Sequence, residues 1–485
     1  MEISSQPTIS EIHNLYRNLI ATPSVVAEFM LNRSKLTDQS IKSCLRFTDL
    51  RAKNEAVRYD EILSSELSFD EILKKYPLFG IPYNLKDNIL VEGEIATSAS
   101  KIIENFKSTY SSTVYLKLYN AGAILISQSN LDEWAVGSST ENSAYGASKN
   151  PFDQDRVPGG SSGGPAANVG SGQSVFALGS DTGGSIRQPA SFCNVVGIKP
   201  TYGAISRYGV MPLASSLDQV GPFTNSVEDN QTVLNVLMGK DQFDQTTSQT
   251  TSHPTTKTKI DNLIIGIAKE YFIEGADPQI VKAVNEIIDQ LKTQGHTVIE
   301  VSLPLTKYGL AVYYTTMTVE TASNLQRYDG IRFGAQLPLN SEFEQFFSVR
   351  EKHFGPEPKR RIMLGTFASS SGYYDAYYNK AMMVKELMSR DFNNVFQQCD
   401  VLIAPTTPEF PFKFGDKTNN IVKMYLSDVL VYGANLCKIP SISVPMGFFE
   451  HEGKQLPAGI QIMADEWQED KIYNVALLIE KKIIS

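Results

Sequence analysis

Two turns rich in glycine and serine lie close together in this chain. They are PGGSSGGPA, residues 158–166, and SDTGGSIRQPA, residues 180–190. The segment QSVFALG, residues 173–179, has the apolar character of a buried strand and leads into the second turn. Backbone N–H groups in such a turn can stabilise a carbonyl oxygen as it becomes an oxyanion. Ser185, at the end of this turn, is therefore a candidate nucleophile for attack on a carbonyl carbon.

The first turn admits several interpretations. Its Gly160, Ser162 and Gly164 match the G-x-S-x-G spacing of α/β-hydrolase nucleophiles, but KNPFDQDRVP, residues 149–158, stands where that motif requires a strand. The turn lacks the lysine of a Walker phosphate loop and the G-x-G-x-x-G pattern of a dinucleotide site. A flexible Gly-Ser loop remains the alternative for this turn taken by itself.

A serine nucleophile needs a group that accepts its proton. Each histidine of the chain lies in a segment better explained as surface or turn: His13, His253, His296, His353 and His451. We therefore expect a base other than histidine.

A buried lysine can serve as the base if desolvation brings its pKa from ~10.4 down to ~7 or 8. Lys86 follows the apolar run in LFGIPYNLKDNIL, residues 78–90, and is our candidate. The alternative is an ion pair of Lys86 with Asp87 or another carboxylate. Spacing alone does not join Lys86 to Ser161 and Ser185.

Four segments together resemble the core of the amidase signature family, in order and context as well as in residue types: GIPYNLKDNI, VPGGSSGGPAA, LGSDTGGSIRQPA and VGIKPTYGAISRYGV. By this resemblance Ser185 is the nucleophile, Ser161 relays the proton and Lys86 is the neutral base. The peptide bond before Ser161 is expected to be cis, and Ser162 is expected to be a structural neighbour only. The resemblance also implies an oxyanion hole made by four backbone N–H groups, those of Thr182, Gly183, Gly184 and Ser185.

Further segments extend this resemblance over nearly the whole chain, to the glutamine-hydrolysing members that serve tRNA-dependent amidotransferases. They are residues 131–153, 215–230, 324–334, 358–381 and 424–445. The residues that match the glutamine-binding positions of these members are Tyr313, Arg361 and Asp428. A guanidinium can hold the α-carboxylate of glutamine through two hydrogen bonds, while a carboxylate faces its α-ammonium group. Tyr314 and Arg360 are adjacent alternatives.

The activity implied by this resemblance is glutamine hydrolysis that supplies ammonia to an ATP-dependent amidation of tRNA. The product would be Gln-tRNA(Gln) from Glu-tRNA(Gln), or Asn-tRNA(Asn) from Asp-tRNA(Asn). The implied partners are the B and C subunits of a heterotrimer, with ATP, Mg²⁺ and the misacylated tRNA handled by the partner. No cofactor and no metal site are expected in this chain. The alternative is a stand-alone hydrolase of small carboxamides, which would keep the triad but would not need Arg361 and Asp428.

Strands and helices must position these residues. Short apolar runs bounded by Gly, Pro or Asp predict strands within residues 121–128, 261–268, 296–303, 400–408, 441–445 and 458–464. Apolar residues at helical spacing predict a helix over residues 278–295, with Pro278 in its first turn and Gly295 near its end.

This alternation of strands and helices predicts an α/β fold, with a mostly parallel sheet covered by helices on both faces. The resemblance implies the amidase signature fold, a single α/β/α domain over residues 1–485 around a large, twisted, mixed sheet. We expect the catalytic core within about residues 75–230. The polar, Thr-rich stretch at about residues 241–259 is predicted to be an exposed surface loop.

The composition narrows the classes of partner. A net charge of −9 argues against broad binding to phosphate backbones, which depends on Lys and Arg. The four cysteines show no paired spacing, so we expect reduced thiols. The N-terminal residues lack the pattern of a leader, and we found no apolar run of the roughly 18 residues that a membrane helix needs. We therefore expect a cytoplasmic protein with no membrane contact.

Overall fold

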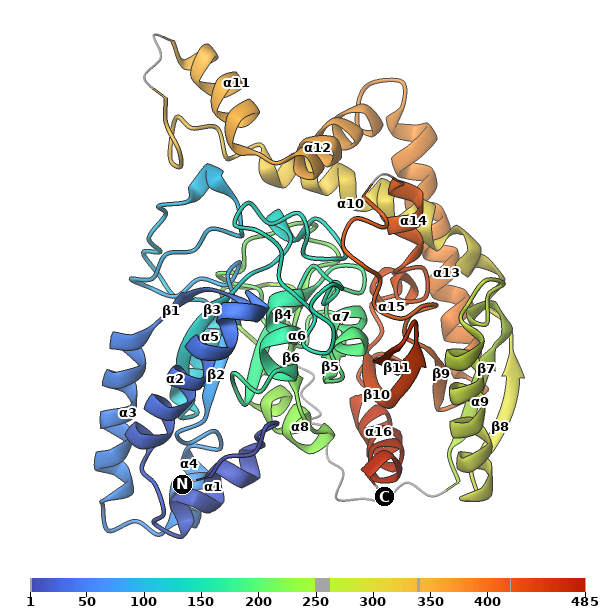
Figure 1. Cartoon of the computed structure of the whole chain (residues 1–485). Helices are drawn as coiled ribbons and strands as arrows, with labels where there is room; N and C mark the ends of the chain where they lie inside the picture. The colour runs from blue at the N-terminus through green and yellow to red at the C-terminus, as the bar shows by residue number, and fades with distance from the viewer. Residues whose placement is uncertain (1, 249–261, 338–340, 419, 485) are drawn as a thin grey trace.

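The computed structural model describes residues 2–248, 262–337, 341–418 and 420–484 (Figure 1). Within these residues, eleven strands form one sheet in the order β1-β3-β2-β4-β6-β5-β10-β11-β9-β7-β8. The strands are β1 Cys44–Phe47, β2 Pro82–Lys86, β3 Ile124–Ser129, β4 Phe176–Asp181, β5 Val196–Lys199, β6 Gln219–Thr224, β7 Ile264–Ala268, β8 Thr297–Val301, β9 Val401–Pro405, β10 Ser441–His451 and β11 Lys454–Ala464.

The sheet is mixed. Strands β3, β2 and β4 run parallel at one side, and β8, β7 and β9 run parallel at the other. Between them, β6, β5, β10 and β11 pair antiparallel with their neighbours. The expectation of a mostly parallel sheet, drawn from alternation alone, is therefore wrong, whereas the mixed sheet implied by the family resemblance is confirmed. The alternation of strands and helices did not predict the middle of the sheet, because the β10–β11 hairpin and the β5–β6 pair have no crossover helix between their strands.

Helices surround this sheet (Figure 1). They are α1 Ile9–Arg17, α2 Pro23–Ile41, α3 Asp49–Leu63, α4 Phe69–Lys75, α5 Thr113–Asn120, α6 Gly163–Gly170, α7 Arg187–Phe192, α8 Val227–Leu237, α9 Pro278–Thr293, α10 Gly309–Leu325, α11 Glu342–His353, α12 Pro356–Ala368, α13 Lys380–Phe396, α14 Ile421–Leu426, α15 Tyr432–Leu436 and α16 Glu469–Ile484. Short 3-10 turns lie at Lys101–Ile103, Glu133–Ala135, Lys269–Tyr271 and Pro304–Tyr308, and a π-helical turn lies at Asp375–Asn379. None of the described helices is long and apolar enough to cross a membrane.

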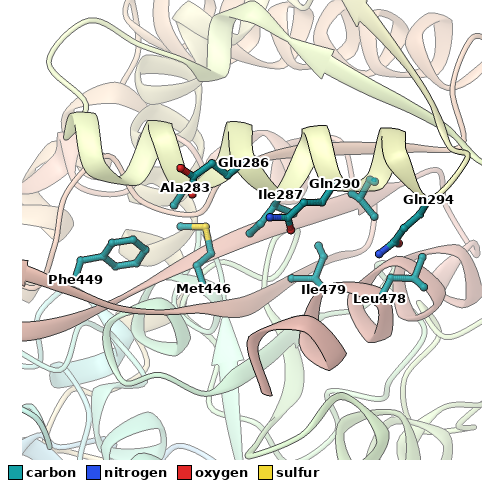
Figure 2. A pocket seen from close by; sticks show the side chains of 10 residues that line it. Ala283, Glu286, Ile287, Gln290, Gln294, Met446, Phe449, Leu478 and Ile479 are labelled. Atoms are coloured by element: carbon teal, nitrogen blue, oxygen red, sulfur yellow. The ribbon is translucent and has the colours of Figure 1, made fainter. Parts of the chain in front are cut away.

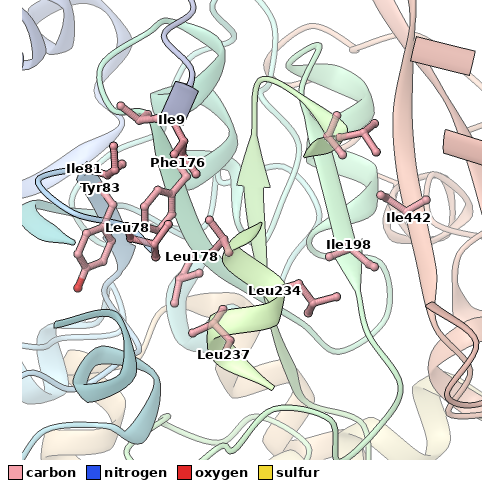
Figure 3. Close-up of a cluster of buried hydrophobic side chains, with 14 of the residues drawn as sticks. Ile9, Leu78, Ile81, Tyr83, Phe176, Leu178, Ile198, Leu234, Leu237 and Ile442 are labelled. Atoms are coloured by element: carbon pink, nitrogen blue, oxygen red, sulfur yellow. The ribbon is translucent and has the colours of Figure 1, made fainter. Parts of the chain in front are cut away.

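The two faces of the sheet carry separate hydrophobic cores. Along β9, Val401 and Ile403 belong to one core, and the intervening Leu402 and Ala404 belong to the other. This follows from the strand geometry, in which successive side chains point to opposite faces. The first core also contains residues of α1 and α8, some of which Figure 3 shows, and of α9. The second contains residues of α10, α13 and α15. Helices therefore cover both faces, as predicted.

The predicted βαβ unit around residues 278–295 is confirmed. Helix α9 connects the parallel neighbours β7 and β8, and it begins at Pro278, whose missing N–H is tolerated in the first turn. It ends at Thr293, two residues before Gly295, which has φ +96°. Asp277 caps the N-terminus by accepting a hydrogen bond from the backbone N–H of Gln279.

The polar stretch at residues 241–259 is only partly described. Asp241 is buried and accepts hydrogen bonds from the hydroxyls of Thr113 and Ser206. Asp244 is also buried and forms an ion pair with Arg207. The prediction of an exposed loop holds for Gln242, Phe243, Gln245 and Thr246, whereas Asp241, Asp244 and Thr247 are buried. The rest of the stretch lies outside the described residues.

Candidate active site

The nucleophile turn follows the end of β4 and is organised by the last residue of that strand. The Asp181 carboxylate accepts hydrogen bonds from the backbone N–H groups of Gly184, at 2.8 Å, and Ile186, at 3.0 Å. These two bonds fold residues 182–186 around the carboxylate. Ser185 lies between the two donors, on the turn that leads into α7, and its side chain is largely buried.

Asp181 is itself held by a buried ion pair. Arg187 donates to it from Nε and Nη2, both at 3.2 Å, and Asn435 donates to it from Nδ2 at 2.9 Å. Burial opposes ionisation, but the charge and hydrogen bonds of Arg187 outweigh it and hold the pKa of Asp181 below its usual range. The anchor of the nucleophile turn therefore stays a carboxylate at neutral pH.

Two glycines in this turn cannot be replaced without collision. A Cβ at Gly183 would lie 2.4 Å from the ring of Tyr313, and a Cβ at Gly184 would lie 2.2 Å from the side chain of Val431. Gly184 also has φ +117°, which residues with side chains rarely adopt. The turn thus allows other segments to approach its backbone closely.

The four backbone N–H groups expected to form the oxyanion hole differ in their hydrogen bonds. The N–H of Gly184 is committed to Asp181, so it is not free to donate to an oxyanion. Within the described residues, the structure shows no hydrogen bond for the N–H groups of Thr182, Gly183 and Ser185. One of the four expected donors is thus engaged within the turn and three are unpaired among the residues described, and the role of the set towards substrate stays a prediction.

The first serine turn lies directly against the second. The backbone N–H of Ser162 donates to the carbonyl of Ser185 at 3.2 Å, which joins the two turns. The carbonyl of Ser161 accepts from the N–H of Asp132, also at 3.2 Å. The peptide bond between Gly160 and Ser161 is cis, as the family resemblance predicted.

Lys86 ends β2 and has no exposed surface. Its Nζ lies 2.9 Å from Ser161 Oγ, 2.7 Å from Ser162 Oγ and 2.9 Å from Ser180 Oγ. The structure therefore brings together Lys86 and Ser161, which spacing alone could not join. Asp87 instead accepts hydrogen bonds from Thr97 and contacts Arg46, so the alternative of a Lys86–Asp87 pair is not what the structure contains.

Burial lowers the pKa of Lys86 to about 7, against the opposing charges of Asp132, Asp181 and Asp218. A lysine with this pKa is partly neutral at physiological pH, and only the neutral amine has a lone pair that can accept a proton. The lysine that sequence reasoning selected thus has the electrostatic property that a general base requires.

Ser162 contacts the base directly, which sequence reasoning missed. Its hydroxyl donates to the carbonyl of Ser180 at 2.9 Å, so it can only accept from Lys86. One N–H of the neutral amine is thereby fixed on Ser162, and Ser180 Oγ is in place to accept the other. The lone pair of Lys86 then faces Ser161. The G-x-S-x-G spacing had marked Ser162, but as a nucleophile rather than as a partner of lysine.

The histidines lie elsewhere, with one correction. His13 is buried on α1 beside Phe69, with ring centroids 5.8 Å apart, so it is not a surface residue. Burial lowers the pKa of His13 to about 4. His296 is buried as well, and His253 lies outside the described residues. The hydrogen bonds of Ser161 and Lys86 involve none of the described histidines.

The three residues expected to bind glutamine come from distant segments. Tyr313, on α10, places its ring against Gly183 of the nucleophile turn and stacks on Tyr432, with centroids 4.4 Å apart. The adjacent Tyr314 instead contacts the guanidinium of Arg361 through its ring face, at 4.5 Å. Tyr313 is thus the tyrosine beside the nucleophile, and Tyr314 is the one beside the arginine.

The choice between the two arginines of α12 is clear from their burial. The side chain of Arg361 is 4% exposed, whereas that of Arg360 is 39% exposed. Nε of Arg361 donates to Glu357 at 2.6 Å, and its guanidinium lies over the rings of Tyr314 and Tyr425. Glu357 thereby fixes the Nε side of the guanidinium, and Nη1 lies 3.9 Å from Sδ of Met317.

Asp428 is a buried carboxylate with one unpaired oxygen. Its Oδ2 accepts from the hydroxyl of Ser138, while Oδ1 has no hydrogen-bond partner among the described residues. Burial raises the pKa of Asp428 well above its usual range, against the lowering effect of Ser138. A ligand ammonium at Oδ1 would supply the missing partner and favour the charged form.

Other features of the described residues do not indicate a second site of this kind. A cavity of about 190 Å³ lies between helix α9, strand β10 and helix α16 (Figure 2). Its lining includes Ile287, Met446 and Ile479. Its lining contains none of the predicted site residues. The four cysteines are free thiols. Among the described residues, no group of three or more His, Cys, Asp and Glu side chains is arranged to hold a metal ion.

Known proteins resemble this chain over nearly its full length. The family model described as Amidase matches residues 25–473, and the chain belongs to this amidase family. The A subunit of glutamyl-tRNA(Gln) amidotransferase from Heliobacterium modesticaldum is 43% identical over 479 residues, which cover 98% of this chain and 96% of that protein. The protein of the same name from Carboxydothermus hydrogenoformans is 50% identical over 410 residues, 84% of each chain.

The fold comparison agrees. The crystal structure of the A subunit of glutamyl-tRNA(Gln) amidotransferase from Thermotoga maritima matches with a TM-score of 0.81 and 35% identity, over 99% of this chain and 96% of that one. A 6-aminohexanoate cyclic dimer hydrolase matches with a TM-score of 0.83 at 23% identity, over 99% and 98%, which shows the shared fold alone.

Proposed function

We propose that this chain is the glutamine-hydrolysing A subunit of a glutamyl-tRNA(Gln) amidotransferase. Relatives of this name cover nearly the whole chain, and the catalytic geometry fits hydrolysis of a carboxamide. The observation that favours glutamine over other amides is a pair of buried side chains, one a guanidinium and the other a carboxyl group. Arg361 and the unpaired Oδ1 of Asp428 match the α-carboxylate and α-ammonium groups of a free amino acid.

In the proposed reaction, Lys86 accepts the proton of Ser161 while Ser161 accepts the proton of Ser185. The Ser185 oxygen bonds to the carboxamide carbon, and the carbonyl oxygen becomes an oxyanion beside the N–H groups of the nucleophile turn. When the intermediate collapses, the C–N bond breaks and the proton returns from Lys86 through Ser161 to the leaving nitrogen, which departs as ammonia. Water then attacks the glutamyl ester, releases glutamate and regenerates Ser185.

The ammonia is the product that the complex uses. In this proposal a B subunit binds the misacylated tRNA and uses ATP and Mg²⁺ to activate its carboxylate, while a C subunit completes a cytoplasmic heterotrimer. The glutamine-hydrolysing chain itself uses no cofactor. Its negative charge fits an arrangement in which tRNA contacts lie mainly on a partner. The same geometry serves amidation of Asp-tRNA(Asn), because glutamine is the ammonia donor in both cases.

Ammonia release from glutamine and from a panel of simple carboxamides tests this proposal. The wild-type chain and Ser185→Ala are compared, each alone and coexpressed with B and C subunits. We expect glutamine-selective release that requires the partners and vanishes in the variant. Brisk hydrolysis of other amides by the chain alone would make it a stand-alone amidase and would remove the binding role of Arg361 and Asp428.

A further inference from the structure

We propose that Gln188 is a positioning residue that aligns the ammonium-binding carboxylate Asp428 with the Gly160–Ser161 turn, an inference that rests on the proposed function. Gln188 has no exposed surface and lies on α7, three residues after Ser185. It does not belong to the triad, the oxyanion turn or the predicted glutamine ligands.

The amide of Gln188 is bonded at both ends. Its Oε1 accepts from the backbone N–H of Gly160 at 2.9 Å, and its Nε2 donates to the carbonyl of Ser138 at 2.9 Å. Only this orientation of the amide pairs a donor with an acceptor at each end. The carboxamide of Gln188 therefore fixes the distance between the proton-relay turn and the Ser138 loop.

The Ser138 loop in turn holds Asp428. The hydroxyl of Ser138 donates to Oδ2 of Asp428, which leaves Oδ1 without a partner among the described residues. A continuous chain of hydrogen bonds thus runs from Asp428 through Ser138 and Gln188 to Gly160. Buried hydrogen bonds of this kind hold groups in one arrangement, because each broken bond leaves an unsatisfied polar group.

The consequence is a specificity effect. A glutamine whose ammonium group is bound at Asp428 presents its carboxamide to Ser185 at a position set by this chain. A substrate without the ammonium group does not use Asp428, so it depends on Gln188 only through Gly160. Loss of Gln188 should therefore lower kcat/KM for glutamine more than kcat/KM for a substrate that lacks the α-amino group.

The experiment compares glutamine with glutaric acid monoamide, which is glutamine without its α-amino group, using the full chain coexpressed with its partners. For Gln188→Met we expect kcat/KM for glutamine to fall about tenfold further than kcat/KM for the monoamide, with a raised KM for glutamine. In an Asp428→Asn background, the same substitution should cause no additional loss of selectivity. Equal losses for the two substrates, or no loss for either, would overturn the inference.

Two further variants keep the test decisive. Gln188→Glu retains an acceptor for the N–H of Gly160 but, when ionised, cannot donate to the carbonyl of Ser138. We expect this variant to lose glutamine hydrolysis selectively. It tests the inference if Gln188→Met does not fold. Gln173→Met is the matched control, since Gln173 is equally buried but bonds to Ser34 and Asn168. We expect it to change both substrates equally, and a selective loss there would overturn the inference. A wild-type complex that hydrolyses other amides but not glutamine would overturn the proposed function as well.

Discussion

The catalytic centre and the expected glutamine site adjoin each other but are built from different chemistry. The catalytic centre consists of serine hydroxyls, backbone N–H groups and a lysine whose pKa burial lowers to about 7. The glutamine site contains a buried guanidinium, a buried carboxylate and a set of stacked tyrosines. The first contains no group that distinguishes one carboxamide from another. The second offers a guanidinium and a carboxyl group with an unpaired oxygen, a set that matches the two charged groups of a free amino acid.

The two regions also differ in how the chain assembles them. The catalytic residues lie on β2, at the end of β4 and in the turns beside them, so adjacent strands of one sheet bring them together. The residues expected to bind glutamine come from α10, α12 and the segment before α15. Contact between the regions is direct at Gly183, where the Tyr313 ring occupies the space that a side chain would need. The segments expected to bind the substrate of Ser185 therefore lie outside the sequence motifs that contain the catalytic residues.

The largest effect is expected from removing the base, which should silence both kinds of substrate. Lys86→Met keeps a buried chain of similar length but has no group that accepts a proton, so kcat for glutamine and for the monoamide should fall about 1,000-fold or more. Steady-state ammonia release measures this, with thermal unfolding as the check on folding. If the variant kept its activity on the monoamide, Lys86 would not be the base for that substrate.

A smaller and selective effect is expected in the glutamine site, where the chain provides its own control. Arg361→Gln removes a charge-assisted pair of hydrogen bonds to the α-carboxylate, so kcat/KM for glutamine should fall about 100-fold, mostly through KM. Arg360→Gln, which alters the exposed neighbour, should change it by less than about twofold. Kinetics of the two variants side by side decide between them, and a larger loss for Arg360→Gln would reverse the assignment.

Removal of Ser162 should have an intermediate effect on chemistry and none on selectivity. Ser162→Ala takes away the acceptor that directs one N–H of Lys86, so kcat should fall about tenfold for glutamine and monoamide alike. The ratio of the two kcat/KM values is the informative measurement. A change in that ratio would show that Ser162 belongs to the glutamine site rather than to the base.

The smallest effect is expected from a change in charge near the base. Activity should rise with pH through the pKa of Lys86, about 7, because only the neutral amine accepts a proton. The negative charge of Asp132 raises the pKa of Lys86, so Asp132→Asn should move the acid limb of the kcat/KM profile to lower pH. A shift to higher pH, or none, would show that Asp132 does not raise the pKa of Lys86.

Much of the catalytic centre could be predicted because its residues stand in short, locally readable segments. The strand before Ser185, the glycines of its turn and the apolar run before Lys86 all carry their signals within a dozen residues. The features of the catalytic centre that could not be predicted are individual hydrogen bonds. The N–H of Gly184 is distinguished from those of its neighbours by its hydrogen bond to Asp181. Ser162 can accept a hydrogen bond from Lys86 because its own hydroxyl donates to the carbonyl of Ser180.

The sequence by itself predicted the strands and helices that periodicity marks, a serine as the nucleophile and a base other than histidine. It also carried the family resemblance that paired Lys86 with the serines. Only the tertiary structure decided that the middle of the sheet is antiparallel, that Asp241 is buried, and that Gln188 links Gly160 to Ser138. The physical reason is range: propensity and periodicity act over a few residues, whereas burial, hydrogen-bond partners and pKa values depend on groups that folding brings from distant parts of the chain.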